Sequence, residues 1–456
     1  MKLIVKPFIV GLAFFTIVSS ISTQPLAADR PYISVGAAHT KKAILAFPAI
    51  KLRNEVGNLR EVAKSISDTV NNDLMFMDLF RLLDAKAFIE DAKTAGLTPE
   101  TFKISNWTSI GAEFLIKTQL SREANSLILE AYLYDTFGNK QVLAKRYLAA
   151  PSESKILAHT LANDIVHALT GLPGIFLTKI AMSCDRQGHK EIYSMDFDGS
   201  NILQITHHKS TAISPAWSPD GTKIAYSVYV KNKSNIVNQD LFEFDFTRSA
   251  ILKLWSKKGM NSGATYSPDG KKIALTMSFR GNPEIYSLDR ATLKETRLSN
   301  SFGFDVDPSF SPDGTKVAFV SSRSGMPMVF SMNADGTKPQ RLTYAGRYNA
   351  SPSWSPQNNK IAFAGWLDKQ FDIFMMNPDG SNIERLTKNQ GDNEDPSFSP
   401  DGNFVIFSSD RVGGRNIYVM NIEGSYVKRL TYGLGSCSAP KWSLPLQPGP
   451  AKIPGQ

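Results

Sequence analysis

Residues 308–319 read Pro-Ser-Phe-Ser-Pro-Asp-Gly-Thr-Lys-Val-Ala-Phe, and close copies of this segment recur through the second half of the chain. The aromatic residues of the copies are separated by 49 residues once and by 44 residues four times: Trp217, Tyr266, Phe310, Trp354, Phe398 and Trp442. Self-similarity at such a period is typical of a repeat architecture. The repeat is therefore the strongest indicator of the fold.

Each repeat unit contains four short strand patterns separated by turns. In the third unit the predicted strands are residues 308–311, 316–321, 328–333 and 339–343. The turns between them carry Pro and Gly, because proline presets φ for a type I turn and glycine accepts the left-handed position that closes a hairpin. Four antiparallel strands in a 44-residue period are typical of a β-propeller blade.

The last copy of the repeat, residues 439–444, contains only a first strand. Residues 178–185 and 191–206 supply the second, third and fourth strands of the same blade. We therefore predict a six-bladed β-propeller closed by the C-terminal strand, and not an open solenoid, which would need polar capping repeats. The chain enters this ring on the face that carries the Asp-Gly turns, so the preceding domain attaches there and the opposite face, the free face, stays open.

Residues 29–172 have no repeat and mix helix and strand patterns, which predicts an N-terminal α/β domain. The predicted strands are residues 42–47, 112–117, 127–134 and 141–149, and the predicted helices are residues 59–74 and 153–169. The second helix is expected to be capped by Ser152 and ended by Gly171. The propeller is predicted over residues 173–445, followed by a Pro-rich tail over residues 446–456.

The first 28 residues have the pattern of a secretory signal peptide: Lys2 and Lys6, an apolar run over residues 8–18, and Ala27-Ala28 at the cleavage point. An uncleaved anchor is the alternative. The segment that follows, residues 29–40, has apolar side chains among small residues. It is either an ordinary first strand or a mobile segment that docks on a partner through Asp29, Tyr32, Ile33 and Val35.

The composition is that of a globular protein. With 42% hydrophobic and 20% charged residues, the 456-residue chain is neither disordered nor a polytopic membrane protein. The formal net charge of +9 falls to +7 without the two lysines of the signal peptide. Basic residues occur in runs no longer than two, so we expect a mildly basic surface and no nucleic-acid partner.

Polar loops enter the first strand of each blade on the free face, beside the channel. Loops on a rigid scaffold are where binding residues collect. The predicted partner-binding residues at this channel mouth are Met260, Asn261, Phe304, Asp305, Asp307, Tyr348, Asn349, Asp392, Asn393, Glu394 and Asp395. Their carboxylates predict a negative potential suited to a basic partner surface or a cation. An arginine recurs directly after the second strand of four blades. We expect these arginines, the second series, to pair with acidic loops of neighbouring blades: Arg186, Arg280, Arg323 and Arg411.

Catalytic motifs are absent from the sequence. It contains no Gly-x-Ser-x-Gly elbow, no phosphate-binding Gly-x-x-x-x-Gly-Lys and no His-Glu-x-x-His, and its six histidines form no ligand set. We therefore predict no catalytic residues, no metal site and no cofactor.

Two cysteines lie near the point where the ring closes. Cys184 ends the second strand of the closing blade and Cys437 immediately precedes its first strand. They correspond to Ser321 and Asp305 of the third unit, which face each other if Phe310 pairs with Val317. The two thiols would then be within reach of a disulfide bond, and two unlinked thiols are the alternative.

The repeats, the strand-donating Pro440-Lys-Trp442-Ser443, the signal peptide and the preceding α/β domain together resemble the TolB family of the Tol-Pal system. The resemblance implies a periplasmic, non-enzymatic binding protein that contributes to outer-membrane integrity and to constriction during cell division. It implies that the channel mouth binds the lipoprotein Pal, with the contact loops at Met260-Asn261 and residues 305–307. It also implies that residues 29–40 communicate with the inner-membrane protein TolA, and that other envelope proteins are further candidate partners. An exported propeller hydrolase acting on peptides or glycans is the alternative function.

Overall fold

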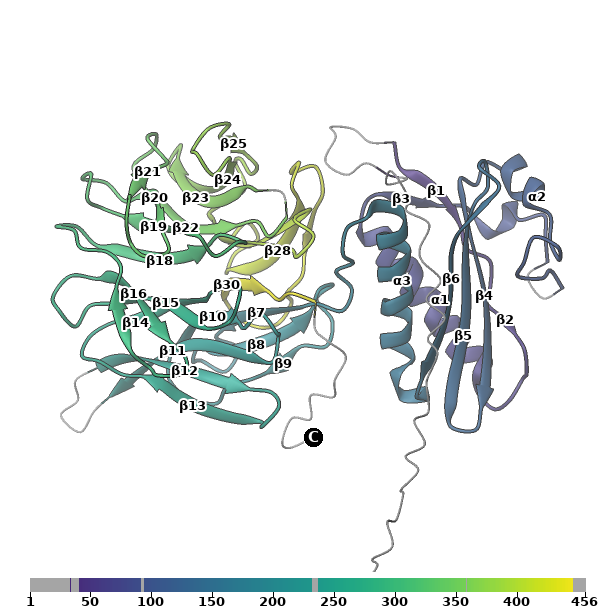
Figure 1. The fold of residues 1–456 in the computed structure, drawn as a ribbon, viewed down its shortest axis with the longest axis horizontal. Helices are drawn as coiled ribbons and strands as arrows, with labels where there is room; N and C mark the ends of the chain where they lie inside the picture. The colour runs from purple at the N-terminus through teal and green to yellow at the C-terminus, as the bar shows by residue number, and fades with distance from the viewer. Residues whose placement is uncertain (1–32, 34–40, 92–93, 232–236, 358, 446–456) are drawn as a thin grey trace, which may run out of the picture.

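The computed structural model describes residues 33, 41–91, 94–231, 237–357 and 359–445. The predicted signal peptide and the predicted C-terminal tail lie outside these residues. Two bodies lie side by side along the long axis of the molecule, an N-terminal α/β domain and a β-propeller (Figure 1). No helix among the described residues is both long enough and apolar enough to cross a bilayer.

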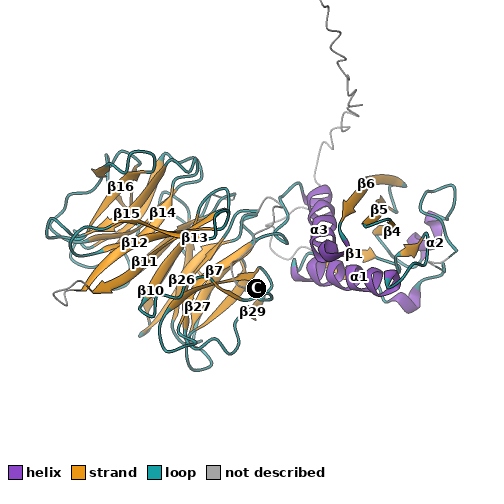
Figure 2. Ribbon diagram, turned by 90° about the horizontal axis from the view of Figure 1, so that it is seen from below, coloured by secondary structure: helices purple, strands orange, loops and turns teal. Residues whose placement is uncertain are grey.

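The N-terminal domain is a mixed sheet with the strand order β3-β1-β4-β5-β6, and β2 pairs with β4. Its strands are β1 (Ala43–Ala46), β2 (Lys51–Leu52), β3 (Phe80–Leu82), β4 (Phe114–Glu123), β5 (Ser126–Asp135) and β6 (Lys140–Ala149). Its helices are α1 (Leu59–Phe76), α2 (Ile104–Ser109) and α3 (Ser154–Thr170). Helix α3 lies between the sheet and the propeller, and helix α1 packs along the sheet with one end toward the propeller (Figures 1 and 2).

The predicted end of α3 is confirmed, whereas its predicted start is corrected. Gly171 takes a left-handed conformation, φ 74°, and its N–H donates to the carbonyl of His167. Ser152 does not cap the helix, because Pro151–Glu153 form a 3₁₀ turn ahead of α3 and the Glu153 carboxylate accepts the Ala150 N–H at 3.1 Å. Strands β2 and β3 and helix α2 were not predicted.

Six four-stranded antiparallel sheets form the propeller, as the repeat predicts. Blade 1 is β10 (Ala212–Trp217), β11 (Lys223–Lys231), β12 (Val237–Asp245) and β13 (Ala250–Trp255). Blade 2 is β14 (Asn261–Tyr266), β15 (Lys272–Met277), β16 (Glu284–Asp289) and β17 (Glu295–Arg297). Blade 3 is β18 (Asp305–Phe310), β19 (Lys316–Ser321), β20 (Met328–Asn333) and β21 (Gln340–Arg341). Blade 4 is β22 (Asn349–Trp354), β23 (Ile361–Leu367), β24 (Gln370–Met376) and β25 (Glu384–Arg385). Blade 5 is β26 (Asn393–Phe398), β27 (Phe404–Ser409), β28 (Asn416–Asn421) and β29 (Val427–Arg429).

Blade 6 closes the ring with strands from both ends of the propeller sequence. Its order is β30-β7-β8-β9, with β30 (Cys437–Trp442), β7 (Lys179–Cys184), β8 (Glu191–Asp196) and β9 (Leu203–Gln204). A closed ring leaves no first strand without a neighbour, which removes the exposed edge of an open array. The predicted closure is therefore confirmed.

The Ser-Pro-Asp-Gly segment has a direct structural explanation in the turn between the first and second strands. In blade 3 the Ser311 hydroxyl donates to the Asp313 carboxylate at 2.5 Å and accepts the Lys316 N–H at 2.9 Å. Gly314 follows with φ 69°, a conformation that disfavours residues with a Cβ. The serine and aspartate side chains thus provide hydrogen-bond partners within the turn, which explains why the segment repeats.

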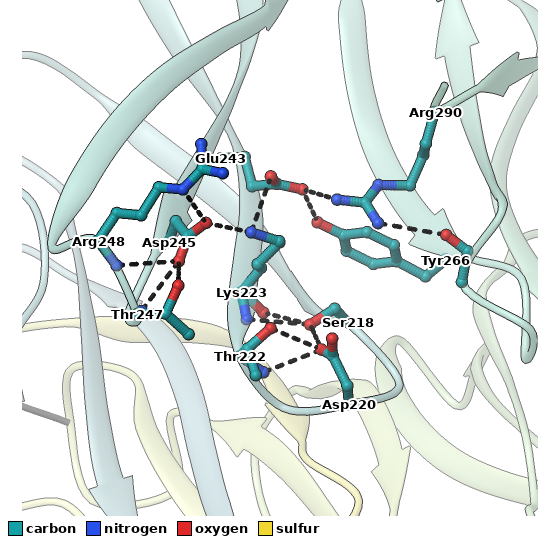
Figure 3. A network of polar contacts seen from close by, with 11 residues as sticks. Ser218, Asp220, Thr222, Lys223, Glu243, Asp245, Thr247, Arg248, Tyr266 and Arg290 are labelled. Carbon is teal, nitrogen blue, oxygen red and sulfur yellow. Dashed lines mark hydrogen bonds and ion pairs between the residues drawn. The ribbon is translucent and has the colours of Figure 1, made fainter. Parts of the chain in front are cut away.

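Polar contacts join neighbouring blades of the ring. The buried Glu243 carboxylate of blade 1 accepts the Tyr266 hydroxyl of blade 2 at 2.6 Å and the Arg290 guanidinium at 2.9 Å (Figure 3). A buried charge is tolerated where such partners compensate its lost hydration. The aromatic position of the repeat therefore carries a specific bond in blade 2, where it is tyrosine.

The N-terminal domain packs on the face that carries the Asp-Gly turns. The Phe76 ring at the end of α1 lies 5.0 Å from the Phe197 ring, 5.4 Å from the Phe404 ring and 6.4 Å from the Tyr426 ring. Each of these three propeller residues adjoins a turn on that face. The predicted attachment is confirmed: the described part of the N-terminal domain contacts this face of the disc and not the opposite one.

Candidate functional site

The candidate site is the channel mouth on the free face, where a loop enters the first strand of every blade. The structure divides its predicted residues into two groups according to their burial. One group lies inside the blades and holds the loops, and the other is open to solvent.

The first residue of the inner strand is buried in blades 2 to 5. The buried residues are Asn261, Asp305, Asn349 and Asn393, each at most 3% exposed. The Asn261 amide donates to the carbonyls of Gln239 and Lys257 at 2.8 and 2.7 Å. This burial disfavours direct contact between these four side chains and a docked partner, and their role as partner contacts stays a prediction.

Two of these buried residues bind an arginine of the second series. Arg323 donates to the Asp305 carboxylate at 2.8 Å, and Arg411 donates to the Asn393 amide oxygen at 2.8 Å. Both pairs lie within one blade, so the predicted pairing between neighbouring blades is corrected. The arginine follows the second strand and the acceptor begins the first, and the antiparallel pairing brings these two points together.

The same position carries the disulfide in blade 6. Cys437 is paired with Cys184 in the strand register, as Asp305 is with Ser321 in blade 3, and the two cysteines form a disulfide bond. The blade that joins two distant chain segments thus replaces the polar contact of other blades with a covalent one.

The second group of predicted residues remains accessible at the mouth. Tyr348 is 39% exposed, and Met260, Phe304, Asp392 and Glu394 are partly exposed. Glu394 forms an ion pair with Arg415, and the Asp392 carboxylate accepts the Phe371 N–H at 2.8 Å. These side chains, together with the exposed Asp307 and the partly exposed Asp395 at the channel, are the part of the predicted surface that a docked partner can touch.

A β-bulge in every inner strand lines the channel itself. The predicted partner-binding residues include two of the six bulge positions, Asp307 and Asp395. The residue at each bulge has a left-handed φ between 49° and 62°: Ser214, Gly263, Asp307, Ser351, Asp395 and Ala439. All six line one cavity of about 430 Å³. In five of the six copies the bulge residue directly precedes the repeated proline. Its identity varies from copy to copy while the proline is constant, and this variation could have indicated the residues that line the channel.

Charge in the channel comes from Asp307, Asp395 and Lys441. The Asp395 carboxylate accepts the Ser351 hydroxyl at 3.1 Å, the Ser408 hydroxyl at 3.2 Å and the Ala439 N–H at 3.0 Å. Reduced hydration inside the ring, together with the neighbouring Asp395, raises the pKa of Asp307 to about 6, although the side chain is open to the channel. Burial also lowers the pKa of Lys441, against the attraction of both carboxylates.

The predicted N-terminal docking segment is described at one residue only. Asp29, Tyr32 and Val35 lie outside the described residues. Ile33 is 9% exposed, and its N–H donates to the carbonyl of Leu169 at 2.9 Å. That one residue therefore packs against the end of α3.

Within the described ranges, no three His, Cys, Asp or Glu side chains gather so that they could hold a metal ion. The channel mouth is thus defined by its shape, its aromatic residues and its carboxylates.

Family models match both parts of the chain. The model described as "TolB beta propeller domain" matches residues 166–366 and 349–446, and the model described as "TolB amino-terminal domain" matches residues 31–142. Together they reproduce the domain order that the sequence predicts.

Proteins similar to this chain in sequence or structure are named TolB or TolB homolog. The chain is 36% identical to "Tol-Pal system protein TolB" of Desulfosudis oleivorans over 61% of its own length, and 36% identical to "Protein TolB homolog" of Chlorobium chlorochromatii over 62%. The chain spans 62% of the length of each of these two relatives. The crystal structure of TolB from Acinetobacter baumannii matches with a TM-score of 0.76 at 25% identity, covering 89% of this chain and 97% of that one.

Proposed function

Because this chain belongs to the TolB family, we propose that it is a periplasmic binding scaffold of the Tol-Pal system. In this proposal the free face of the propeller binds Pal in the outer membrane, and residues 29–40 bind TolA of the inner membrane. The link between the two membranes would support outer-membrane integrity and constriction during division. The role is one of binding and not of catalysis.

The observation that supports this proposal is the asymmetry of the propeller. The N-terminal domain covers part of the face that carries the Asp-Gly turns, through Phe76 and the three rings around it. The free face presents Met260, Phe304, Tyr348 and Glu394 around a channel lined by carboxylates. A rigid ring with accessible aromatic and charged side chains around one opening is suited to holding a protein partner.

A pull-down of Pal from the same organism by the protein without residues 1–28 tests the proposal. We expect the wild type to retain Pal and the double variant Asp307→Asn, Glu394→Gln to lose at least about tenfold in affinity, the effect of losing one or two well-placed charge contacts. Glu384→Gln, on the exposed outer strand of blade 4, is the matched control and should bind as the wild type does. Failure of the wild type to bind would refute the assignment of Pal. Equal binding by the double variant would refute the site.

A further inference from the structure

Blade 4 departs from the repeat at the end of its second strand. In four other blades the corresponding residue accepts a backbone N–H from the loop that enters the first strand, at 2.6 to 2.9 Å: Asp185 from Ser436, Ser278 from Met260, Ser322 from Phe304, and Asp410 from Asp392. In blade 4 this residue is Trp366. Its backbone N–H donates to the carbonyl of Tyr348 at 2.7 Å, as the backbone N–H of the corresponding residue does in the other four blades, so only the side-chain bond is missing. The indole side chain cannot accept a hydrogen bond, so blade 4 lacks the side-chain bond that holds the entering loop in the other four blades. It has an aromatic ring at this position instead.

The exchange creates an aromatic pocket beside the channel. The Phe371 ring lies 5.6 Å from the Tyr348 ring and 4.9 Å from the Trp366 ring, both in edge-to-face geometry. These three rings line a cavity of about 610 Å³ together with Asp307 and Glu394. Asp307 also lines the channel, so the pocket adjoins the channel mouth.

The charges in the pocket favour a cation. Its lining contains two carboxylates, Asp307 and Glu394, against one guanidinium, that of the exposed Arg347. Glu394 is already paired with Arg415, whereas no hydrogen bond to the Asp307 carboxylate is found among the residues that the structure describes. Both carboxylates act on Tyr348, whose pKa is raised by burial and then by Asp307 and Glu394.

The aromatic rings favour the same kind of ligand. The face of an aromatic ring attracts a cation within about 6 Å, and attracts it more strongly when water is excluded. Asp307 is exposed in the unbound protein, so an apolar side chain in this pocket would cover its carboxylate without giving it a partner, and an acidic side chain would be repelled. A lysine or arginine side chain satisfies both the rings and the carboxylate.

We propose that the pocket formed by Tyr348, Trp366 and Phe371 with Asp307 receives one basic side chain of the protein that binds the free face. The proposal deepens the proposed function and rests on it for the identity of that protein. In this proposal Asp307 is the counter-ion of the bound lysine or arginine, and the three aromatic rings form the walls of the pocket around that side chain.

Two small probes test the pocket without the partner. N-acetyl-L-lysine methylamide carries the ammonium, and N-acetyl-L-norleucine methylamide has the same aliphatic chain without it. We expect saturation-transfer NMR with the protein lacking residues 1–28 to show at least about fivefold tighter binding of the lysine probe, the scale of one cation–π contact and one ion pair. Asp307→Asn, which keeps the shape of the side chain, and Phe371→Leu should each abolish the preference. Tyr344→Ala, 72% exposed on the same face and outside the pocket, should keep it.

The same preparations are then tested against Pal. If the wild type binds Pal but shows no preference for the lysine probe, the pocket inference is overturned while the proposed function stands. A lysine preference that survives in folded Asp307→Asn also overturns it. If the lysine preference appears as expected but Pal is not bound, the identity of the partner is refuted and the pocket is supported. Thermal unfolding of each variant establishes that it is folded.

Discussion

Opening the Cys184–Cys437 bond should loosen the ring at the blade where it closes. The bond links segments 253 residues apart, and the chain-entropy relation for a loop of that length gives a stabilisation of about 5.5 kcal/mol. Measured disulfides commonly provide about 2–4 kcal/mol, because the reduced unfolded chain retains structure. For a propeller of this size we expect Cys184→Ser, Cys437→Ser to lower the Tm by on the order of 5–10 °C.

Urea unfolding followed by tryptophan fluorescence provides the measurement, since Trp442 lies on the closing strand. Hydrogen exchange adds spatial detail: in the double variant, β30 and β7 should lose protection before the central strands of blade 3 do. The matched comparison is Ser321→Ala, at the same register position in a blade with no disulfide. It removes the hydrogen bond that the Arg323 guanidinium donates at 2.8 Å and should therefore cost less than the loss of the disulfide bond. A double variant as stable as the wild type within about 0.5 kcal/mol would refute the reasoning, because it would mean that strand pairing alone holds the ring closed.

Three further predictions concern the domain interface, the contacts between blades and the channel. Phe76→Ala should destabilise the protein by about 3–5 kcal/mol and hasten proteolysis of residues 171–178. The neighbouring Met75, 51% exposed, is the control: Met75→Ala should do neither, and equal destabilisation by the two variants would contradict the packing role of Phe76. Tyr266→Phe should cost about 1.5–3 kcal/mol in urea unfolding by removing a hydrogen bond to the buried Glu243, and a neutral result would show that this bond adds nothing. Because the pKa of Asp307 is raised to about 6, its carboxylate becomes neutral as pH falls through 6, and the lysine probe should then bind more weakly. The other charged groups that face Asp307 are Asp395, Lys441, Glu394 and Arg347. Asp307→Asn should remove this midpoint from an NMR titration, and a midpoint that persists would assign it to another group.

The blade pattern was predictable because its causes are local. Residues 308–319 specify a strand, a turn and a strand through alternation and turn chemistry, and the structure places β19 at the predicted Lys316–Ser321. Helix α1 begins at the predicted Leu59, since its apolar spacing marks one face. Strand β3 escaped prediction because three residues carry too little pattern, and its place in the sheet comes from its pairing with β1.

The channel mouth was predictable in position but not in detail. Loops before each first strand were expected to carry the binding residues, yet Asn261 and Asp305 are buried. Sequence alone does not distinguish an asparagine that caps a loop internally from one that faces a partner, because both lie in polar loops. Trp366 and Phe371 were missed for a related reason, as each reads as an ordinary strand residue.

By itself, the sequence determined the number of blades, the strand that closes them, the face to which the first domain attaches and the register that brings Cys184 to Cys437. These follow from periodicity and antiparallel pairing, which depend on the order of residues along the chain. Only the tertiary structure decided which mouth residues are enclosed, that Asp307 lies near Asp395 and Lys441, and that three rings of blade 4 form a pocket with it. Those properties depend on which side chains different blades bring together across the ring, and on how much water remains around them.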